Sequence, residues 1–214
     1  FVNEAAPYED VVKGQYASQA KGIDSVPAFM VFDARFRETY PCGPIGPASA
    51  QPDSMIPKRY EGFLKKADSL EELANILGVD AEGLVDEVAK NNRFAETGID
   101  EDFARGSSLH DRYYSDPKIT PNPNIAPIIK APFYAFEIYP GDLGTKGGLK
   151  ANEHGQVLSE TGETIDGLYV TGNSSGAVMG NSYPGAGSTI GPSMAFGYMA
   201  ACHAMGQIPQ GERK

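Results

Sequence analysis

The chain has 214 residues, enough for one large or two small domains with a sizeable core. The hydrophobic fraction of 41% is ordinary for a globular protein. The formal net charge of −10 argues against a nucleic-acid partner, because binding to one requires lysine and arginine to replace its counterions. The same charge disfavours docking on anionic membranes.

Further features concern compartment and ligands. The two cysteines, Cys42 and Cys202, form no CxxC pair, which favours free thiols in a cytoplasmic protein. No run of about 18 apolar residues is present, so we expect no membrane span. None of the three histidines has a second ligand at metal-ligand spacing, and we predict no metal site. The chain begins on Phe1 rather than Met, and we expect it to be a piece of a longer protein.

The first part of the chain predicts a mixture of strands and helices. Residues 1–4 have a strand-like pattern that ends at Pro7, and residues 11–19 favour a short helix. The apolar run over 28–33 indicates a buried strand. A loop rich in glycine, proline and serine follows over 42–57.

Two helices come next, each with its own start and stop signals. Ser69 and Glu72 form a capping box, and Gly78 ends the first helix. Asp80 caps the second helix and Gly98 terminates it. Their apolar stripes are Leu70, Leu73, Ile76 and Leu77, and then Leu84, Val85 and Val88. We assign this pair of helices a packing role and no chemistry.

Residues 100–132 are polar and rich in proline, which indicates an ordered surface excursion or a partly mobile lid. The alternating run 133–139 favours a strand. Beyond it glycine becomes frequent, and 13 of the 25 glycines lie between Gly141 and Gly191. In this glycine-rich part we expect strands over 149–152, 156–158 and 168–171 and a last helix over 193–205.

This change of composition places a domain boundary near residue 143. We predict an α+β domain over residues 1–143 and the returning end of a larger α/β domain over residues 144–214. A nucleotide-binding fold normally opens with its glycine loop, whereas here the strand, glycine loop and helix close the chain. We therefore expect the chain to complete a cofactor site whose beginning is missing.

The glycine loop before the last helix is the first candidate for binding. Gly185, Gly187 and Gly191 permit positive φ and a close backbone approach. A helix start offers unpaired N–H groups and partial positive charge, and Ser188 and Thr189 add hydroxyl donors. Such a site suits phosphate, or the carbonyl side of a flavin ring, which becomes anionic on reduction. The alternative is a tight turn with no ligand.

Tyr183 precedes this loop and is the first candidate for catalysis. Its hydroxyl can donate a hydrogen bond to a carbonyl oxygen, and the N–H of Gly187 could donate to the same oxygen. Two converging donors make an oxyanion hole. The alternative is a packed aromatic side chain. Lys146-Gly147-Gly148 indicates another close approach of the backbone to a ligand, or a plain turn.

Four segments together carry a family resemblance. They are Asp-Leu-Gly-Thr-Lys-Gly-Gly-Leu over 142–149, Gly-Leu-Tyr-Val-Thr-Gly-Asn over 167–173, Tyr-Pro-Gly-Ala-Gly over 183–187, and Asn-Glu-Ala-Ala-Pro-Tyr over 3–8. They resemble the FAD-dependent 3-ketosteroid 1-dehydrogenases, within the fumarate-reductase-like flavoproteins. The likeness runs over nearly the whole chain and is tightest over 142–205.

The resemblance implies a fold and a cofactor. In that family a substrate domain interrupts an α/β FAD domain. Residues 1–143 would be most of the substrate (catalytic) domain, and 144–214 the carboxy-terminal return into the FAD domain. The amino-terminal half of the FAD domain would be a partner missing from this chain. The residues implied near FAD are Gly147, Gly148, Gly172, Asn173, Gly187, Ser188, Thr189 and Ile190.

The reaction that the resemblance implies removes two hydrogens from adjacent carbons of a steroid A ring. Tyr183 and the Gly187 N–H would polarise the 3-keto oxygen, Tyr8 would take the proton on carbon 2, and the flavin would accept hydride from carbon 1. Candidates for the lining of a steroid cleft are Phe29, Phe32, Phe133, Phe136 and Met179. Ordinary core packing is the alternative for these five.

Two other functions fit parts of the sequence. A fumarate-reductase-like enzyme needs cationic residues to clamp a dicarboxylate, yet no arginine lies between Lys146 and Arg213. The other alternative is a non-catalytic module, because a chain with half of the FAD site should not hold FAD tightly.

Overall fold

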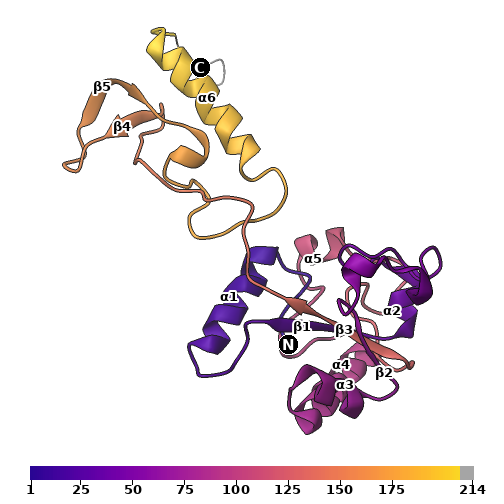
Figure 1. The fold of residues 1–214 in the computed structure, drawn as a ribbon. Helices are drawn as coiled ribbons and strands as arrows, with labels where there is room; N and C mark the ends of the chain where they lie inside the picture. Colours follow the sequence, from indigo (N-terminus) through magenta and orange to yellow (C-terminus); the bar gives the residue numbers. More distant parts are fainter. Residues whose placement is uncertain (208–214) are drawn as a thin grey trace. The chain divides into compact units, whose positions relative to one another are not determined.

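The computed structural model describes residues 1–207 (Figure 1). The chain divides into two compact units with the bounds Phe1–Pro140 and Gly141–Lys214. Both contain helices and strands, so the predicted mixture of α and β structure is confirmed. Within the described residues, no helix has the length and apolar character that crossing a membrane requires.

The first unit is built around a three-stranded antiparallel sheet in the order β1–β3–β2. The strands are β1 (Ala28–Phe32), β2 (Lys65–Ala67) and β3 (Phe133–Ile138). Strands were predicted at the positions of β1 and β3, and both predictions are confirmed. The sequence analysis missed β2, because three residues with two lysines carry no strand pattern.

The side chains of β3 alternate between the two faces of the sheet. Tyr134 and Phe136 lie on one face with Phe32 of β1, and the rings of Phe32 and Tyr134 stack with centroids 5.7 Å apart. Ala135 lies on the other face, where it contacts Leu73. Phe32 and Phe136 are therefore core residues, and the cleft-lining interpretation is wrong for these two.

Five helices and two short 3-10 turns surround this sheet. They are α1 (Tyr8–Gln19), α2 (Ala34–Thr39), η1 (Asp53–Met55), η2 (Lys58–Tyr60), α3 (Leu70–Leu77), α4 (Ala81–Thr97) and α5 (Leu109–Tyr113). Helix α3 lies against β2 and β3, and α4 packs on α3. The sequence analysis missed α2 and α5, which are only six and five residues long.

The predicted caps of α3 and α4 are confirmed. Ser69 Oγ accepts from the Glu72 N–H at 3.1 Å, and Asp80 Oδ2 accepts from the Gly83 N–H at 3.1 Å. Gly78 and Gly98 end the two helices in the left-handed region, with φ of 71° and 76°. These local signals work because each is satisfied within one turn of the chain.

The proline-rich segment after α4 is ordered by side-chain amides. Asn91 and Asn92 of α4 donate to the carbonyl oxygens of Ala126 and Ile128, at 3.1 and 3.0 Å. Ile125 is 2% exposed and belongs to the same apolar cluster as Phe94 of α4. These contacts favour the ordered excursion over residues 125–128, and the partly mobile lid stays a prediction for the rest of the segment.

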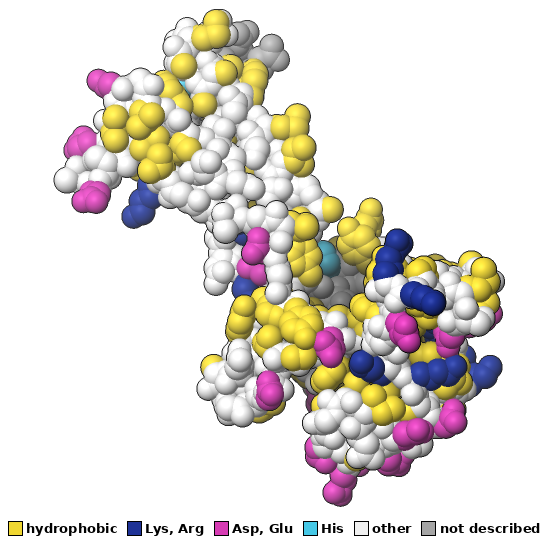
Figure 2. Space-filling view, in the orientation of Figure 1, with side chains coloured by type: hydrophobic (Ala, Val, Ile, Leu, Met, Phe, Trp, Pro, Cys, Tyr) yellow, Lys and Arg dark blue, Asp and Glu magenta, His cyan; other side chains and the backbone are white. Residues whose placement is uncertain are grey.

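Over its described residues, 141–207, the second unit contains a hairpin and one long helix. Its elements are β4 (Gln156–Leu158), β5 (Thr164–Tyr169), the 3-10 turn η3 (Gly172–Ser174) and α6 (Ile190–Ala204). Figure 2 shows hydrophobic side chains gathered over the β4–β5 hairpin, where Ile165 and Leu168 are 42% and 43% exposed. On α6, Met194 and Tyr198 are also exposed. This unit therefore carries unusual apolar surface.

Several boundaries differ from the predictions. Residues 1–4 form no strand, because the Asn3 side chain accepts from the N–H groups of Ala5 and Ala6 and folds the segment into a turn. This turn leads directly into α1, which begins at Tyr8 rather than at residue 11.

The second unit also differs from expectation in detail. Residues 149–152 contain only isolated bridges, one from Leu149 to Ser175 and one from Ala151 to Val157. The strand expected over 168–171 runs over Thr164–Tyr169, and the helix expected from residue 193 begins at Ile190. The strand expected over 156–158 is confirmed as β4.

Candidate functional site

Two of the glycine-rich motifs lie side by side in the second unit. The N–H groups of Gly147 and Leu149 donate to the carbonyl oxygens of Asn173 and Ser174, at 3.1 and 3.0 Å. Gly148 lies between them and faces Ser174 so closely that a Cβ would overlap its carbonyl oxygen. At Gly148 the close backbone approach is made to the chain itself, whereas the sequence predicted an approach to a ligand.

Lys146 joins this framework to the loop that contains Tyr183. Its Nζ donates to the carbonyl oxygen of Ser182 and lies 3.4 Å from that of Gly180. An ammonium group hydrogen-bonded to backbone oxygens fixes the two segments relative to each other. Lys146 therefore holds the backbone of Ser182, the residue immediately before Tyr183.

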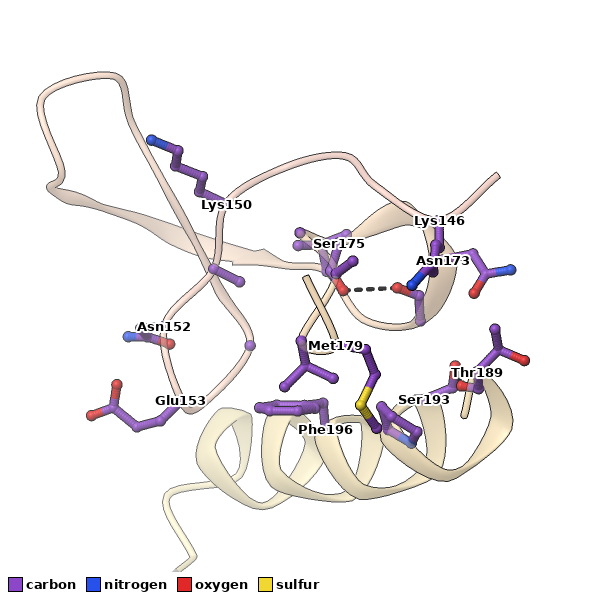
Figure 3. A pocket seen from close by; sticks show the side chains of 18 of the residues that line it. Lys146, Lys150, Asn152, Glu153, Asn173, Ser175, Met179, Thr189, Ser193 and Phe196 are labelled. Carbon is purple, nitrogen blue, oxygen red and sulfur yellow. Dashed lines mark hydrogen bonds between the residues drawn. The ribbon is translucent and has the colours of Figure 1, made fainter. Parts of the chain in front are cut away.

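A pocket of about 460 Å³ lies beside this framework, wholly within the second unit. Figure 3 shows Ser193 and Phe196 rising from α6 into it and Met179 lying across the helix. The N-terminal end of α6 borders the pocket through Thr189. The Ser175 hydroxyl donates to the Gly172 carbonyl oxygen at 2.8 Å and closes the turn on the opposite side. The pocket combines apolar side chains with backbone and hydroxyl groups, as small-molecule sites do.

The start of α6 leaves backbone donors available. Thr189 is the N-cap residue, but its side chain accepts no capping hydrogen bond. Ser188 Oγ bonds instead to the Gly185 carbonyl oxygen at 2.7 Å, and Ser193 Oγ to that of Thr189 at 2.7 Å. Within residues 1–207 the amides of Gly187 and Ile190 have no hydrogen-bond acceptor. An uncapped helix start beside a pocket is suited to an electron-rich ligand.

The predicted cofactor-binding residues divide into two groups. Gly172, Asn173, Ser188 and Thr189 line the pocket. The others lie next to it in the chain without lining it, and these are Gly147, Gly148, Gly187 and Ile190. Gly147 and Gly187 have φ of 149° and 94°, which a residue with a side chain rarely adopts.

The predicted catalytic residues lie in both units. Tyr183 and Gly187 belong to the loop between η3 and α6, where Tyr183 is partly buried and Gly187 is exposed. Tyr8 is the first residue of α1 in the first unit and is 45% exposed. Their roles stay predictions.

Most of the lining residues were not predicted from the sequence, and Ser193 and Phe196 of α6 are among them. These two residues are separated by three positions and therefore lie on one face of α6. The signal is weak because α6 is apolar nearly all round, so no single face stands out in the sequence. Met179, which was a candidate for a steroid cleft, lines this pocket instead of the core.

Titratable groups with shifted pKa values occur in the first unit. Burial raises the pKa of Tyr40, and its hydrogen bond to Asp116 adds to the shift, to about 12. Burial also raises the pKa of Asp53, but hydrogen bonds from Lys66 and Tyr134 outweigh this and lower it overall. The first contact joins two loops and the second ties a loop to the sheet, so we assign both to structure. Within residues 1–207 no group of three or more metal-ligating side chains is suitably placed to hold an ion.

Comparison with known proteins defines the family. The chain matches the FAD binding domain family over residues 1–190. The chain therefore belongs to this family of flavin-binding proteins, and the prediction of FAD as cofactor is confirmed.

Individual relatives of known activity give a more specific similarity than the family does. The chain is 44% identical over 213 residues to 3-oxosteroid 1-dehydrogenase of Mycobacterium tuberculosis, which covers 97% of this chain and 37% of the relative. It is 37% identical over 210 residues to 4-oxocyclohexanecarboxylate 2-dehydrogenase of Sinomonas cyclohexanicum. This match covers 97% of this chain and 35% of the relative.

A solved structure agrees with these relatives. The 3-ketosteroid delta1-dehydrogenase of Sterolibacterium denitrificans, crystallised with 1,4-androstadiene-3,17-dione, has a TM-score of 0.88 and 45% identity, covering 96% of this chain and 37% of that one. The predicted resemblance to the 3-ketosteroid 1-dehydrogenases is confirmed. The chain spans little more than a third of the length of these relatives.

Proposed function

We propose that the protein containing this chain is an FAD-dependent dehydrogenase that acts on adjacent carbons beside a ring ketone, with a 3-ketosteroid as substrate. The observation that carries this proposal is the Tyr-Pro-Gly-Ala-Gly loop of residues 183–187, which leads into the uncapped start of α6 beside the pocket. The 44% identity to a 3-oxosteroid 1-dehydrogenase supports the substrate class.

The residues around the pocket fit one edge of a flavin. The amides of Gly187 and Ile190 and the hydroxyl of Thr189 offer donors to an electron-rich ring edge, and Met179 and Phe196 offer apolar contact. FAD, when bound, supplies the acceptor for the hydride that leaves carbon 1 of the substrate.

The chain itself supplies the proton chemistry in this proposal. The Tyr183 hydroxyl and the Gly187 N–H donate to the 3-keto oxygen, which gathers negative charge as the proton on carbon 2 leaves. Fixed donors stabilise this charge more in the transition state than in the ground state. Tyr8 accepts the proton from carbon 2 as a phenolate, after its own hydroxyl proton has passed to solvent or to a group in the rest of the protein. This requires its oxygen to reach hydrogen-bond distance of that carbon in the complex.

The proposal also assigns the two units. Residues 1–143 form most of the substrate domain, and residues 144–214 form the carboxy-terminal part of the FAD domain. The exposed apolar surface of the second unit supports this, because a helix that is apolar nearly all round is normally buried in a larger domain. Its cover would be the rest of the FAD domain. The two free cysteines support a cytoplasmic location.

The test uses the full-length protein loaded with FAD, a 3-ketosteroid and an artificial electron acceptor. Tyr183→Phe removes one donor to the ketone and should lower kcat roughly 100- to 1000-fold, with a small change in KM. Tyr139→Phe, which removes an exposed hydroxyl bonded to Glu137, is the matched control and should keep full activity. Full activity of Tyr183→Phe would show that the oxyanion assignment is wrong.

A smaller cyclic ketone is the second candidate substrate. The 37% identity to a 4-oxocyclohexanecarboxylate 2-dehydrogenase favours it. Assays on a 3-ketosteroid, a 4-oxocyclohexane carboxylate and fumarate in parallel distinguish the candidates. Turnover of fumarate alone would exclude ketone dehydrogenation and favour the fumarate-reductase-like alternative.

A further inference from the structure

Helix α1, which begins at Tyr8, makes polar contacts with the rest of the first unit through its one fully buried residue. Its buried residue is a glutamine, Gln15, whose Nε2 donates to the carbonyl oxygen of Ile138 at 3.0 Å. The Ser25 hydroxyl donates to the Gln15 carbonyl oxygen at 2.6 Å. These contacts lie two turns away from Tyr8, so they do not by themselves fix the first turn of the helix.

The segment before α1 forms one piece with that first turn. Asn3 Oδ1 accepts from the Ala5 and Ala6 N–H groups at 3.0 and 3.2 Å, which closes a tight turn. The Pro7 carbonyl oxygen then accepts from the Asp10 N–H at 2.8 Å and begins the helix. Any contact that fixes residues 3–4 therefore also constrains the position of Tyr8.

Arg105 provides such a contact from a distant part of the chain. Its Nη1 lies 2.8 Å from Oε1 of Glu4. The guanidinium is 6% exposed and is itself fixed by Asp100, at 2.5 Å from Nε, and by Asn91, at 3.0 Å from Nη2. Because its buried partners set its orientation, Arg105 presents a fixed donor to the segment that precedes Tyr8.

A second contact acts on the same segment. The Asn3 side-chain amide lies 3.4 Å from Oδ2 of Asp111, which also accepts from the Gly106 N–H at 2.9 Å. Gly106 follows Arg105 directly, so both contacts come from one stretch of chain after α4. Two adjacent side chains, Asn3 and Glu4, are thus held by two buried side chains from this stretch, Arg105 and Asp111 of α5.

We infer that Arg105 is a positioning residue for the dehydrogenation: through Glu4 it holds the first turn of α1, and hence Tyr8, where the base must be. The inference rests on the proposed role of Tyr8. A base displaced by about 1 Å loses roughly 100-fold in rate, because proton transfer needs near-attack geometry. Polar contacts at residues 3 and 4 can hold the first turn of α1, whose one fully buried residue is a glutamine.

The experiment uses the full-length FAD-loaded protein and two variants. Glu4→Gln is the mild variant, because the Glu4 side chain is 54% exposed and the substitution removes only its charge. Arg105→Lys removes the fork that joins Glu4, Asp100 and Asn91. We expect kcat to fall about 10-fold in Glu4→Gln and about 100-fold in Arg105→Lys, with KM changed less than about 2-fold. The kinetic isotope effect on removal of deuterium from carbon 2 should rise.

The matched control is Arg37→Lys. Arg37 is also buried in the first unit, at 1% exposed, and it bonds to Asp53 and to the carbonyl oxygens of Gly46 and Gln51. We expect this variant to lose stability but to keep kcat and the isotope effect. Amide hydrogen exchange of residues 1–10 should accelerate in Glu4→Gln and stay unchanged in Arg37→Lys.

Tyr8→Phe separates the inference from the proposed function. If Tyr8→Phe keeps full activity, the proposed role of Tyr8 is wrong and the inference falls with it. If Tyr8→Phe is inactive while Glu4→Gln and Arg105→Lys keep kcat, the isotope effect and the exchange rates of the parent, the proposed function stands and the inference alone is overturned. Should Arg105→Lys fail to fold, Glu4→Gln decides the question.

Discussion

The backbone of Gly148 lies directly against the carbonyl oxygen of Ser174, and no room is left for a β-carbon between them. This contact brings together two segments more than twenty residues apart. It also explains why Lys146 can reach the loop before Tyr183, since the N–H groups on both sides of Gly148 bond to the same turn. The glycine is thus required by packing, and not by an unusual φ.

The first prediction follows from this contact. Gly148→Ala forces the two backbones apart and should destabilise the second unit by about 1–3 kcal/mol, as overpacking does. Urea unfolding of the chain measures the loss. Gly141→Ala is the matched control, since a Cβ there meets nothing within 4 Å. An alanine at position 148 that leaves the unfolding midpoint unchanged would contradict the observed contact.

The second prediction concerns Lys146. Lys146→Met keeps the length of the side chain but removes the donor to the Ser182 and Gly180 carbonyl oxygens. A hydrogen bond to a charged group contributes about 1.5–3 kcal/mol, so amide exchange of residues 179–187 should accelerate by at least about 10-fold. Lys150→Met, another pocket-lining lysine, is the control and should leave this exchange unchanged. Equal exchange in both variants would show that Lys146 does not hold the loop.

Sequence reasoning succeeded where the determinants are local. Ser69, Asp80, Gly78 and Gly98 predicted the ends of α3 and α4, because each acts within one helical turn. The glycine loop before α6 was located from its spacing for the same reason. The alternation of β3 was visible because its two faces pack on two different sets of residues.

Prediction from the sequence failed where the local structure depends on contacts between residues far apart in the chain. Residues 149–152 resemble a strand, but the N–H of Leu149 bonds to Ser174 in an irregular turn and no ladder forms. The link between Glu4 and Arg105 spans 101 positions, and no spacing rule predicts it. The lining residues Ser193 and Phe196 were hidden because α6 has no polar face to mark their side.

The third prediction concerns acid stability and Asp33. Burial raises the pKa of this carboxyl, but hydrogen bonds from Arg35 and from the N–H groups of Ile129, Phe36 and Lys130 lower it below its ordinary value of 3.8. A carboxyl with a lowered folded-state pKa contributes stability that is present above about pH 4 and is lost as the pH falls through that pKa. The contribution should therefore be full at pH 7.

Asp33→Asn tests this contribution. We expect it to lower the free energy of unfolding at pH 7 by about 1–3 kcal/mol, since it weakens several hydrogen bonds to a charged group. The difference from the parent should shrink as the pH falls below about 4. Urea unfolding across this range provides the measurement, and Asp86→Asn, on the exposed side of α4, is the control. A difference that is constant with pH would mean that the charge of Asp33 contributes nothing.

The fourth prediction tests the core under the sheet. Leu73 of α3 is fully buried, and its neighbours in the cluster include Ala67 and Ala135. Alanine has no side-chain rotamers with which to fill a space, so Leu73→Ala should leave a lasting cavity. The free energy of unfolding should fall near the upper end of the range of about 2–5 kcal/mol for such substitutions.

The control for Leu73 lies on the same helix. Ile76→Ala removes a side chain of similar size that is 48% exposed, and alanine also favours the helix, so its cost should stay below about 1 kcal/mol. Urea unfolding of both variants gives the comparison. If the two variants lower the free energy of unfolding equally, the packing of Leu73 against β3 does not determine the stability of the first unit. In that case α3 is held by its caps and by its contact with α4.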